Sequence, residues 1–125
     1  MNITGFGRAS IKVKDLDASE RFYAGALGMP ILTEMRREAE VGFRVGKSNQ
    51  FLLQAAVADA PQDRHLGMHH IAFVVGNNPR TLEAAAQHLT AQGIPFEQVA
   101  HEEYESLYLR DPDGHLIELY YWPEW

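Results

Sequence analysis

A single carboxylate in an apolar strand is the feature of this chain that points most directly to chemistry. Glu118 lies in the segment Leu116–Tyr121, where side chains alternate between two faces, so it shares a face with Leu116 and Tyr120. Burial of an ionised carboxylate costs free energy unless a cation, a metal ion or water compensates it. The structural alternative is an edge strand with a solvated glutamate. The pattern predicts that Glu118 either has a positively charged partner or lies at an edge position that is exposed to solvent.

Glu118 belongs to a predicted hairpin in which Leu107–Arg110 and Leu116–Tyr121 are joined by the turn Pro112-Asp113-Gly114. Proline presets φ at the start of such a turn, and glycine can take the positive φ that closes it. Tyr108 lies on the preceding strand, ten residues before Glu118, so its hydroxyl could face the same cleft. There it would donate a hydrogen bond or a proton to a substrate oxygen, or it would only pack as an amphipathic wall residue.

The elements that would position these residues occur twice along the chain. Each half reads as a strand, a helix and three further strands. In the first half, Asp17 is the candidate helix N-cap with Glu20 three residues later; in the second, Asn78-Pro79 begins the helix and Gly93 ends it. The predicted strands are 9–13, 30–35, 41–45, 51–56, 69–75, 96–99, 107–110 and 116–121. We expect an α+β fold of two tandem βαβββ modules whose curved mixed sheets surround a cleft, with the helices outside.

This duplication predicts one domain over 1–125, with module one at about 1–56, a linker at about 57–68 and module two at about 69–125. Matching Leu52-Leu53-Gln54 to Leu116-Ile117-Glu118 places Gln54 opposite Glu118. Matching Ile11 and Val13 to Phe73 and Val75 places Arg8 opposite His70. If both sheets face one cleft, four pseudo-symmetric side chains converge there: Arg8, Gln54, His70 and Glu118. Within this quartet, His70 and Glu118 are plausible as half of a first-row metal site.

Composition excludes several other functions. Net charge −6 and the lack of any basic run argue against nucleic acid, and no segment is apolar enough for a membrane span or a signal peptide. The chain has no cysteine, so a metal would be held by histidine, carboxylate or amide groups, which favour zinc, nickel, manganese or ferrous iron. Gly5-Phe6-Gly7 lacks the strand-to-helix context of a dinucleotide motif, so no nucleotide cofactor is expected. We expect a cytoplasmic protein with a small-molecule ligand.

Three stretches together carry a resemblance to a known family: Val13-Lys14-Asp15-Leu16-Asp17-Ala18-Ser19-Glu20-Arg21-Phe22-Tyr23, His69-His70-Ile71-Ala72-Phe73-Val74-Val75 and the hairpin from Leu107 to Leu119. They resemble the vicinal oxygen chelate superfamily, which includes glyoxalase I, extradiol dioxygenases, fosfomycin-resistance transferases, methylmalonyl-CoA epimerase and bleomycin-binding proteins. The resemblance covers nearly the whole chain. It is specific for the fold and much less so for the reaction.

The resemblance implies that His70 and Glu118 are metal ligands and that Gln54 stands where a glutamate often serves, as a third ligand or base. Arg8 departs from the family pattern, because it stands where many members have a histidine and a guanidinium does not coordinate metals. Three outcomes stay open. Arg8 turns away while Gln54 and water complete the shell, an anionic substrate bridges the metal and Arg8, or Arg8 pairs with Glu118 in place of the metal.

Two functions follow from these alternatives. The first is a metal-dependent lyase, isomerase or dioxygenase that chelates two vicinal oxygens of a small substrate, with Tyr108 as acid or orienter and Arg8 as a carboxylate clamp. The second is a metal-free protein that sequesters a small molecule, as bleomycin-resistance proteins do, in a pocket lined by Phe73, Tyr104 and Trp122. Single-chain members are commonly homodimers, and the aromatic stretch from Tyr120 to Trp125 agrees with a homodimer.

The remaining histidines are expected to have smaller roles. His69 precedes His70 directly, so alternation along the strand predicts that it faces the opposite side. His101 falls in a loop between two predicted strands, from which it could enter the mouth of the cleft as a general base.

Overall fold

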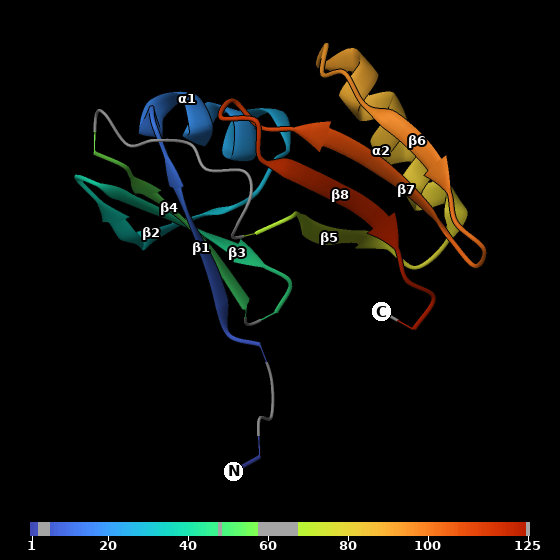
Figure 1. Ribbon diagram of the computed structural model, residues 1–125, viewed down its shortest axis with the longest axis horizontal. Helices are drawn as coiled ribbons and strands as arrows, with labels where there is room; N and C mark the ends of the chain where they lie inside the picture. Colours follow the sequence, from blue (N-terminus) through green and yellow to red (C-terminus); the bar gives the residue numbers. More distant parts are fainter. Residues whose placement is uncertain (3–5, 48, 58–67, 125) are drawn as a thin grey trace. The chain divides into compact units, whose positions relative to one another are not determined.

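The computed structural model describes residues 1–2, 6–47, 49–57 and 68–124. The chain divides into two compact units, unit one at Met1–Gln62 and unit two at Asp63–Trp125. Each unit contains one four-stranded mixed sheet (Figure 1). The predicted helix N-cap in unit one and several strand ends were inexact, but the order of elements is the predicted one.

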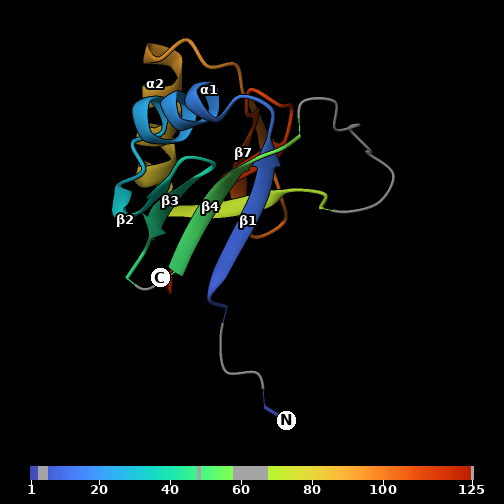
Figure 2. The same cartoon turned by 90° about the vertical axis from the view of Figure 1, so that its left-hand side faces the viewer.

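Unit one contains a strand, a short helical segment and three strands. The elements are β1 (Arg8–Val13), α1 (Leu16–Glu20), a π-helical segment η1 (Arg21–Ala26), β2 (Ile31–Arg37), β3 (Glu40–Val45) and β4 (Asn49–Ala55). The sheet order is β1-β4-β3-β2, with β1 parallel to β4 and the other neighbours antiparallel. Figure 2 shows β1, β4 and β3 side by side.

The helix of unit one begins two residues earlier than the sequence suggested. Asp15, not Asp17, is the N-cap: its side chain accepts a hydrogen bond of 3.1 Å from the amide of Ala18. Glu20 therefore does not close a capping box around Asp17. It instead binds Arg36 of β2, in two hydrogen bonds of 2.5 and 2.8 Å. The prediction of Asp17 was wrong because Asp15 and Asp17 are the same residue type and equally suitable as N-caps. Only the path of the backbone selects between them.

One face of the unit-one sheet is covered by the helical segment and holds the core. Tyr23 is fully buried and its ring packs against those of Phe43 and Phe51, with centroids 6.2 and 5.0 Å away. Because side chains alternate along strands, the strand residues that alternate with Phe43 and Phe51 point to the other face. No helix among the described residues of unit one covers that face. We call that surface the open face of unit one.

Unit two repeats the arrangement. It contains β5 (Ile71–Gly76), α2 (Pro79–Ala91), β6 (Glu97–Ala100), β7 (Glu105–Arg110) and β8 (Leu116–Tyr121), with sheet order β5-β8-β7-β6. Strand β5 is parallel to β8, and the other pairs are antiparallel. Helix α2 packs against β5, β7 and β8. The apolar residues Leu82 and Leu89 of this helix are buried, as are Leu107, Ile117 and Leu119 of the sheet.

The local signals in unit two were read correctly. Asn78 caps α2, accepting a 3.1 Å hydrogen bond from the amide of Arg80, and Pro79 is the first helical residue. Gly93, predicted to end this helix, has φ +69°, the left-handed conformation common at helix ends. In the hairpin turn, Gly114 has φ +82° and its amide donates to the carbonyl of Asp111 at 2.9 Å.

The fold prediction is confirmed: two βαβββ modules, each a four-stranded mixed sheet with few helices. Among the described residues, no helix is both long and apolar enough to cross a membrane.

Candidate functional site

Glu118 lies in the middle of β8, on the face of the unit-two sheet opposite to its buried leucines. Its neighbours Ile117 and Leu119 are buried on the α2 side, so alternation directs Glu118 away from the helix. It is nevertheless only 5 % exposed. Tyr108 of β7 is its direct cross-strand partner, and Ala72 of β5 pairs with it on the other side. The side chains around the carboxylate therefore hold it on the face of this sheet that α2 does not cover.

Two side chains of unit two contact the Glu118 carboxylate. The hydroxyl of Ser106, which is fully buried, donates a hydrogen bond of 2.5 Å to Oε1. His70, just before β5, places Nε2 3.0 Å from Oε2. Both carboxylate oxygens thus have a partner, which meets the requirement that a buried charged group be satisfied. His70 and Glu118 lie together, as expected for a shared site.

His69 does not face the opposite side from His70. The Nδ1 atoms of the two imidazoles lie 2.8 Å apart, close enough for one hydrogen bond. Alternation failed as a guide because β5 begins at Ile71, so both histidines precede the regular strand. If a neutral His70 donates from Nε2 to Glu118, its Nδ1 accepts from His69 Nδ1; if His70 is an imidazolium, both of its ring nitrogens donate and His69 Nδ1 accepts. His69 thus influences which nitrogen of His70 carries a proton.

Tyr108 completes the group of polar side chains around Glu118. Partial burial and the nearby Glu118 carboxylate both raise the pKa of Tyr108 above its ordinary value, burial being the larger cause. At neutral pH its hydroxyl is therefore a proton donor and not a base. His101 Nε2 lies 3.1 Å from this hydroxyl, so His101 does reach the same group of residues.

A row of aromatic rings continues from this group. His101 stacks on Tyr104 with a centroid distance of 4.5 Å, Tyr104 lies 5.9 Å from Tyr120, and Tyr120 lies 6.4 Å from Trp122. The pKa of Tyr120 is raised, first by burial and then by the charge of Glu118. Together these side chains offer flat apolar surface beside a small set of polar atoms, as ligand sites do.

Phe73 is not part of this group. It pairs with Leu119, one residue beyond the pairing of Ala72 with Glu118, so it lies on the other face of the sheet.

Ser106 was missed by the sequence reading. The signal was present, because Ser106 is two residues before Tyr108 and must share its face, but a serine in a strand carries no chemical signature of its own.

Arg8 and Gln54, the two members of the quartet in unit one, are four residues apart along the sheet. In the parallel pairing of β1 with β4, Arg8 is opposite Gln50, and Gln54 is opposite Lys12. The amide of Gln54 donates a 2.9 Å hydrogen bond to Glu40 Oε2. Arg8 is exposed. These two residues are not neighbours in unit one as His70 and Glu118 are in unit two.

The pairing of strands shows that the two alignments behind the quartet do not hold together. In unit two, Glu118 pairs with Ala72, two residues after His70. In unit one, the residue two positions after Arg8 is Ser10, which pairs with Leu52. If Arg8 corresponds to His70, the counterpart of Glu118 is therefore Leu52 and not Gln54. Leu52 is 2 % exposed, against 5 % for Glu118, which agrees with this correspondence.

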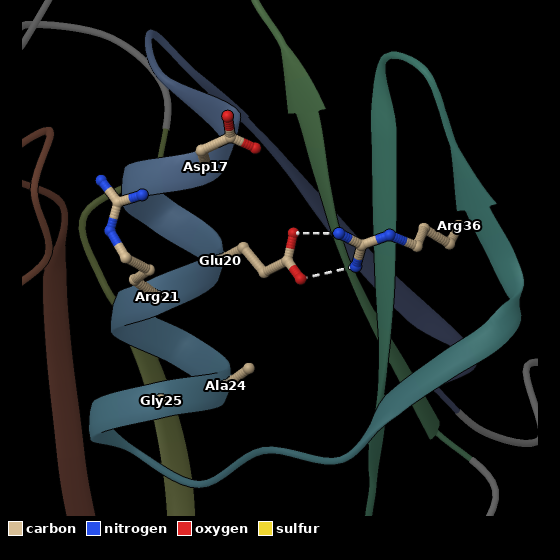
Figure 3. Close-up of a pocket in the computed structure, with 6 residues that line it drawn as sticks. All are labelled: Asp17, Glu20, Arg21, Ala24, Gly25 and Arg36. Atoms are coloured by element: carbon tan, nitrogen blue, oxygen red, sulfur yellow. Dashed lines mark hydrogen bonds and ion pairs between the residues drawn. The ribbon is translucent and has the colours of Figure 1, made fainter.

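A separate hollow of unit one lies between the helical segment and β2 (Figure 3). Its charged groups are largely neutralised, because Arg36 and Glu20 form a two-hydrogen-bond ion pair across it. The hydrogen bond to Glu20, and then its charge, raise the pKa of Arg36. Arg21 points away from this pair in the figure. We read the hollow as a structural junction between α1 and β2.

Comparison with known proteins decides the family. The family model of the Glyoxalase/Bleomycin resistance protein/Dioxygenase superfamily matches residues 5–119. The chain belongs to this superfamily. It is 30% identical over 119 residues to the catechol-2,3-dioxygenase of Bacillus subtilis (strain 168), covering 94% of this chain but 41% of that protein. The chain thus spans about two fifths of that relative's length.

Other proteins match this chain over nearly their whole length. The protein named "Uncharacterized protein YaeR" from Escherichia coli (strain K12) is 26% identical over 121 residues, covering 89% of this chain and 91% of that protein. The crystal structure of lactoylglutathione lyase from Agrobacterium tumefaciens has a TM-score of 0.77 at 22% identity, covering 100% and 98%. A glyoxylase/bleomycin resistance protein/dioxygenase domain from Frankia sp. EAN1pec has a TM-score of 0.78 at 21% identity, covering 96% and 98%. At these identities the structures support the fold.

Members of the superfamily commonly use divalent metals. In the described residues, no three His, Asp or Glu side chains are grouped so that they could hold a metal ion. His70 Nε2 and Glu118 Oε2 do fit as two ligands, because neighbouring ligands that lie about 2.1 Å from a cation at right angles are about 3 Å apart, against the observed 3.0 Å. Ser106 and His69 contact them from outside, as partners of ligands do in metal sites.

Proposed function

We propose that this superfamily member acts on a small molecule with vicinal oxygens and uses a divalent metal ion held by His70 and Glu118. The observation that supports this most directly is the 3.0 Å distance between His70 Nε2 and Glu118 Oε2, each oriented by a second side chain. A bound cation would act as a Lewis acid that polarises a carbonyl or hydroxyl oxygen. Gln54 remains our candidate for a third ligand or base.

The chain's own residues would have three tasks in this function. Glu118 and His70 would anchor the site, with Ser106 fixing one carboxylate oxygen so that the other faces the imidazole. Tyr108, whose raised pKa keeps its hydroxyl protonated, would donate a hydrogen bond or a proton to a substrate oxygen. His101, 3.1 Å from that hydroxyl, could return the proton.

The test is a metal titration followed by a probe that distinguishes vicinal from separated oxygens. Chelator-treated protein would be titrated with Ni²⁺ and with Zn²⁺ by calorimetry, then with catechol and with resorcinol, whose hydroxyls are not vicinal. We expect metal binding that is lost in His70→Ala and kept in His88→Ala, a change at an exposed histidine of α2. Catechol should bind only in the presence of metal. Equal binding of catechol and resorcinol would contradict chelation.

A second candidate function is metal-free binding of a small molecule. The pairing in unit one favours it, because the counterparts of His70 and Glu118 would be Arg8 and Leu52, and neither side chain coordinates metals. Glu118 would then serve structurally, satisfied by Ser106 and His70, and Arg8 could also pair with it as the sequence suggested. The aromatic row from His101 to Trp122 would provide the contact surface.

The two candidates differ in one measurable way. Under the second, a planar aromatic ligand binds chelator-treated protein with the same affinity whether or not metal is added, and His70→Ala changes that affinity little. Under the first, chelator removes binding.

We also propose a cytoplasmic homodimer, whose mass in light scattering at micromolar concentration should be about twice that of one chain.

A further inference from the structure

A row of polar side chains crosses the open face of unit one. Arg8 of β1 pairs with Gln50 of β4, and Gln50 pairs with Arg44 of β3. All three alternate with residues of the buried face, such as Ile11, Phe51 and Phe43, so they point to the open face together. Two guanidinium groups thus flank one amide side chain across three neighbouring strands.

Side chains of such rows do meet on this face. Two rows further along the strands, Gln54 and Glu40 are also cross-strand partners, and their side chains are joined by a 2.9 Å hydrogen bond. Neighbouring strands are about 4.8 Å apart, so the Cα atoms of Arg8 and Arg44 are separated by about 10 Å. Arginine side chains are long enough to converge on one ligand group from that separation.

The charges of Arg8 and Arg44 have no carboxylate beside them among the described residues. Within β1 and β3 the next residues on the same face are Ser10 and Gly42, and neither is charged. Pro30, which directly precedes β2, lies beside Arg44. The backbone amide of Arg44 donates a hydrogen bond to the carbonyl of Pro30. By contrast Arg36 pairs with Glu20, and Arg37 with Glu40. Arg8 and Arg44 are both exposed.

The residue between them carries an independent sign of an incomplete site. Gln50 Oε1 is buried, and no described residue forms a hydrogen bond with it. A covered amide oxygen without a donor destabilises the folded state, so such atoms are rare in folded proteins. A ligand group that draws the two arginines together would bring guanidinium N–H donors, or a donor of its own, to this oxygen.

We propose that Arg8, Gln50 and Arg44 form a binding site for an oxyanion, either a carboxylate or a phosphate group of the ligand. Arginine is suited to this because its planar fork donates two parallel hydrogen bonds to such a group. This inference rests on the proposed function and extends the sequence prediction, in which Arg8 alone was the carboxylate clamp. It adds two residues and states that the small-molecule ligand is anionic.

The test uses inorganic phosphate and succinate as probes, with sodium chloride held so that ionic strength is constant. Two-dimensional NMR of ¹⁵N-labelled protein should show saturable shifts at the amides of Arg8, Arg44 and Gln50. Arg8→Gln and Arg44→Gln should each weaken binding by about tenfold or more, the loss expected for one charge-assisted hydrogen-bonded pair. Arg21→Gln, which removes the same charge from the helical segment of the same unit, should leave binding unchanged.

The two probes and the control give outcomes that decide the question. Succinate binding without phosphate binding assigns the site to carboxylates, and the reverse assigns it to phosphate esters. Equal weakening by Arg21→Gln and Arg44→Gln would mean that only overall charge matters and would overturn the proposal, as would the absence of saturable shifts. The metal titration with His70→Ala is independent of these variants, so either proposal can fail alone.

Discussion

The two units of this chain share a strand order and a pairing pattern, yet among the described residues only unit two has a buried carboxylate. In unit two, Glu118 is held by Ser106 and His70 and faced by Tyr108. At the matching place in unit one, Leu52 is buried between Ser10 and Gly42. The backbone arrangement therefore does not require the polar group. A buried glutamate that the fold can replace with leucine is retained for chemistry, or for a specific partner.

The largest effect should come from removing the negative charge that distinguishes unit two. Glu118→Gln keeps the shape of the side chain but replaces a strong ligand with a weak one. We expect affinity for Ni²⁺ to fall by about hundredfold or more, since even outer partners of ligands contribute about 10–100-fold. Calorimetry would measure this. Gln54→Leu, at a position of unit one outside the matched pair, should lower affinity much less, and equal losses would mean that Gln54 is a ligand of similar weight.

The second prediction concerns the support of Glu118. Ser106→Ala leaves one oxygen of a buried carboxylate without its donor, which should lower the free energy of unfolding by about 2 kcal/mol in urea denaturation. Ser10→Ala, at an exposed serine of the unit-one sheet, should change it by less than about 0.5 kcal/mol. Because removing both polar partners can be nearly neutral, Ser106→Ala combined with Glu118→Leu should recover much of the loss. No recovery would mean that Ser106 is required for packing alone.

The third prediction builds the pattern of unit two into unit one. Arg8→His with Leu52→Glu places a histidine and a carboxylate in the same relative register as His70 and Glu118. We expect Ni²⁺ affinity to rise by about tenfold, one additional ligand pair being the physical cause. Arg8→His with Gln54→Glu puts the two groups four residues apart along the sheet and should give little gain. The opposite ranking would show that the alignment of Gln54 with Glu118 is the correct one.

These variants test the step at which sequence reasoning failed. The apolar matches between the halves were real, and they were sufficient for the fold, because alternation and turn residues such as Gly93 and Gly114 are local signals. The register between the first and last strands of a unit is set by tertiary pairing, and no local pattern encodes it. The first strands of the two units could therefore be aligned acceptably, and so could the last strands. The two alignments nevertheless disagreed with each other by two residues.

The candidate site was predictable to a similar extent. His70, Glu118 and Tyr108 were found from residue type and parity, and the structure brings all three together. His69 and Ser106 were not, since their roles depend on where β5 begins and on a hydroxyl that carries no charge. Phe73 was assigned by residue type, without the parity rule that places it on the other face. Inside the regular strands, parity was thus more informative than chemical character, whereas it misplaced His69, which precedes β5.

The smallest expected effect is a shift in the alkaline titration of two tyrosines of unit two, Tyr108 and Tyr120. Burial and the charge of Glu118 raise the pKa of Tyr108 and of Tyr120 above the ordinary value of about 10. A raised pKa in the folded state means that the protonated phenol is favoured by folding. This contribution to stability is complete below the unfolded pKa and is lost as pH rises through the folded one. Stability should therefore decline above about pH 10, and less so in Tyr108→Phe. The ultraviolet absorbance of phenolate, followed in Glu118→Gln, should show Tyr108 ionising at lower pH than in the wild type, because the charge of Glu118 has been removed. An unchanged titration would mean that the charge of Glu118 does not act on the hydroxyl proposed to donate to the substrate.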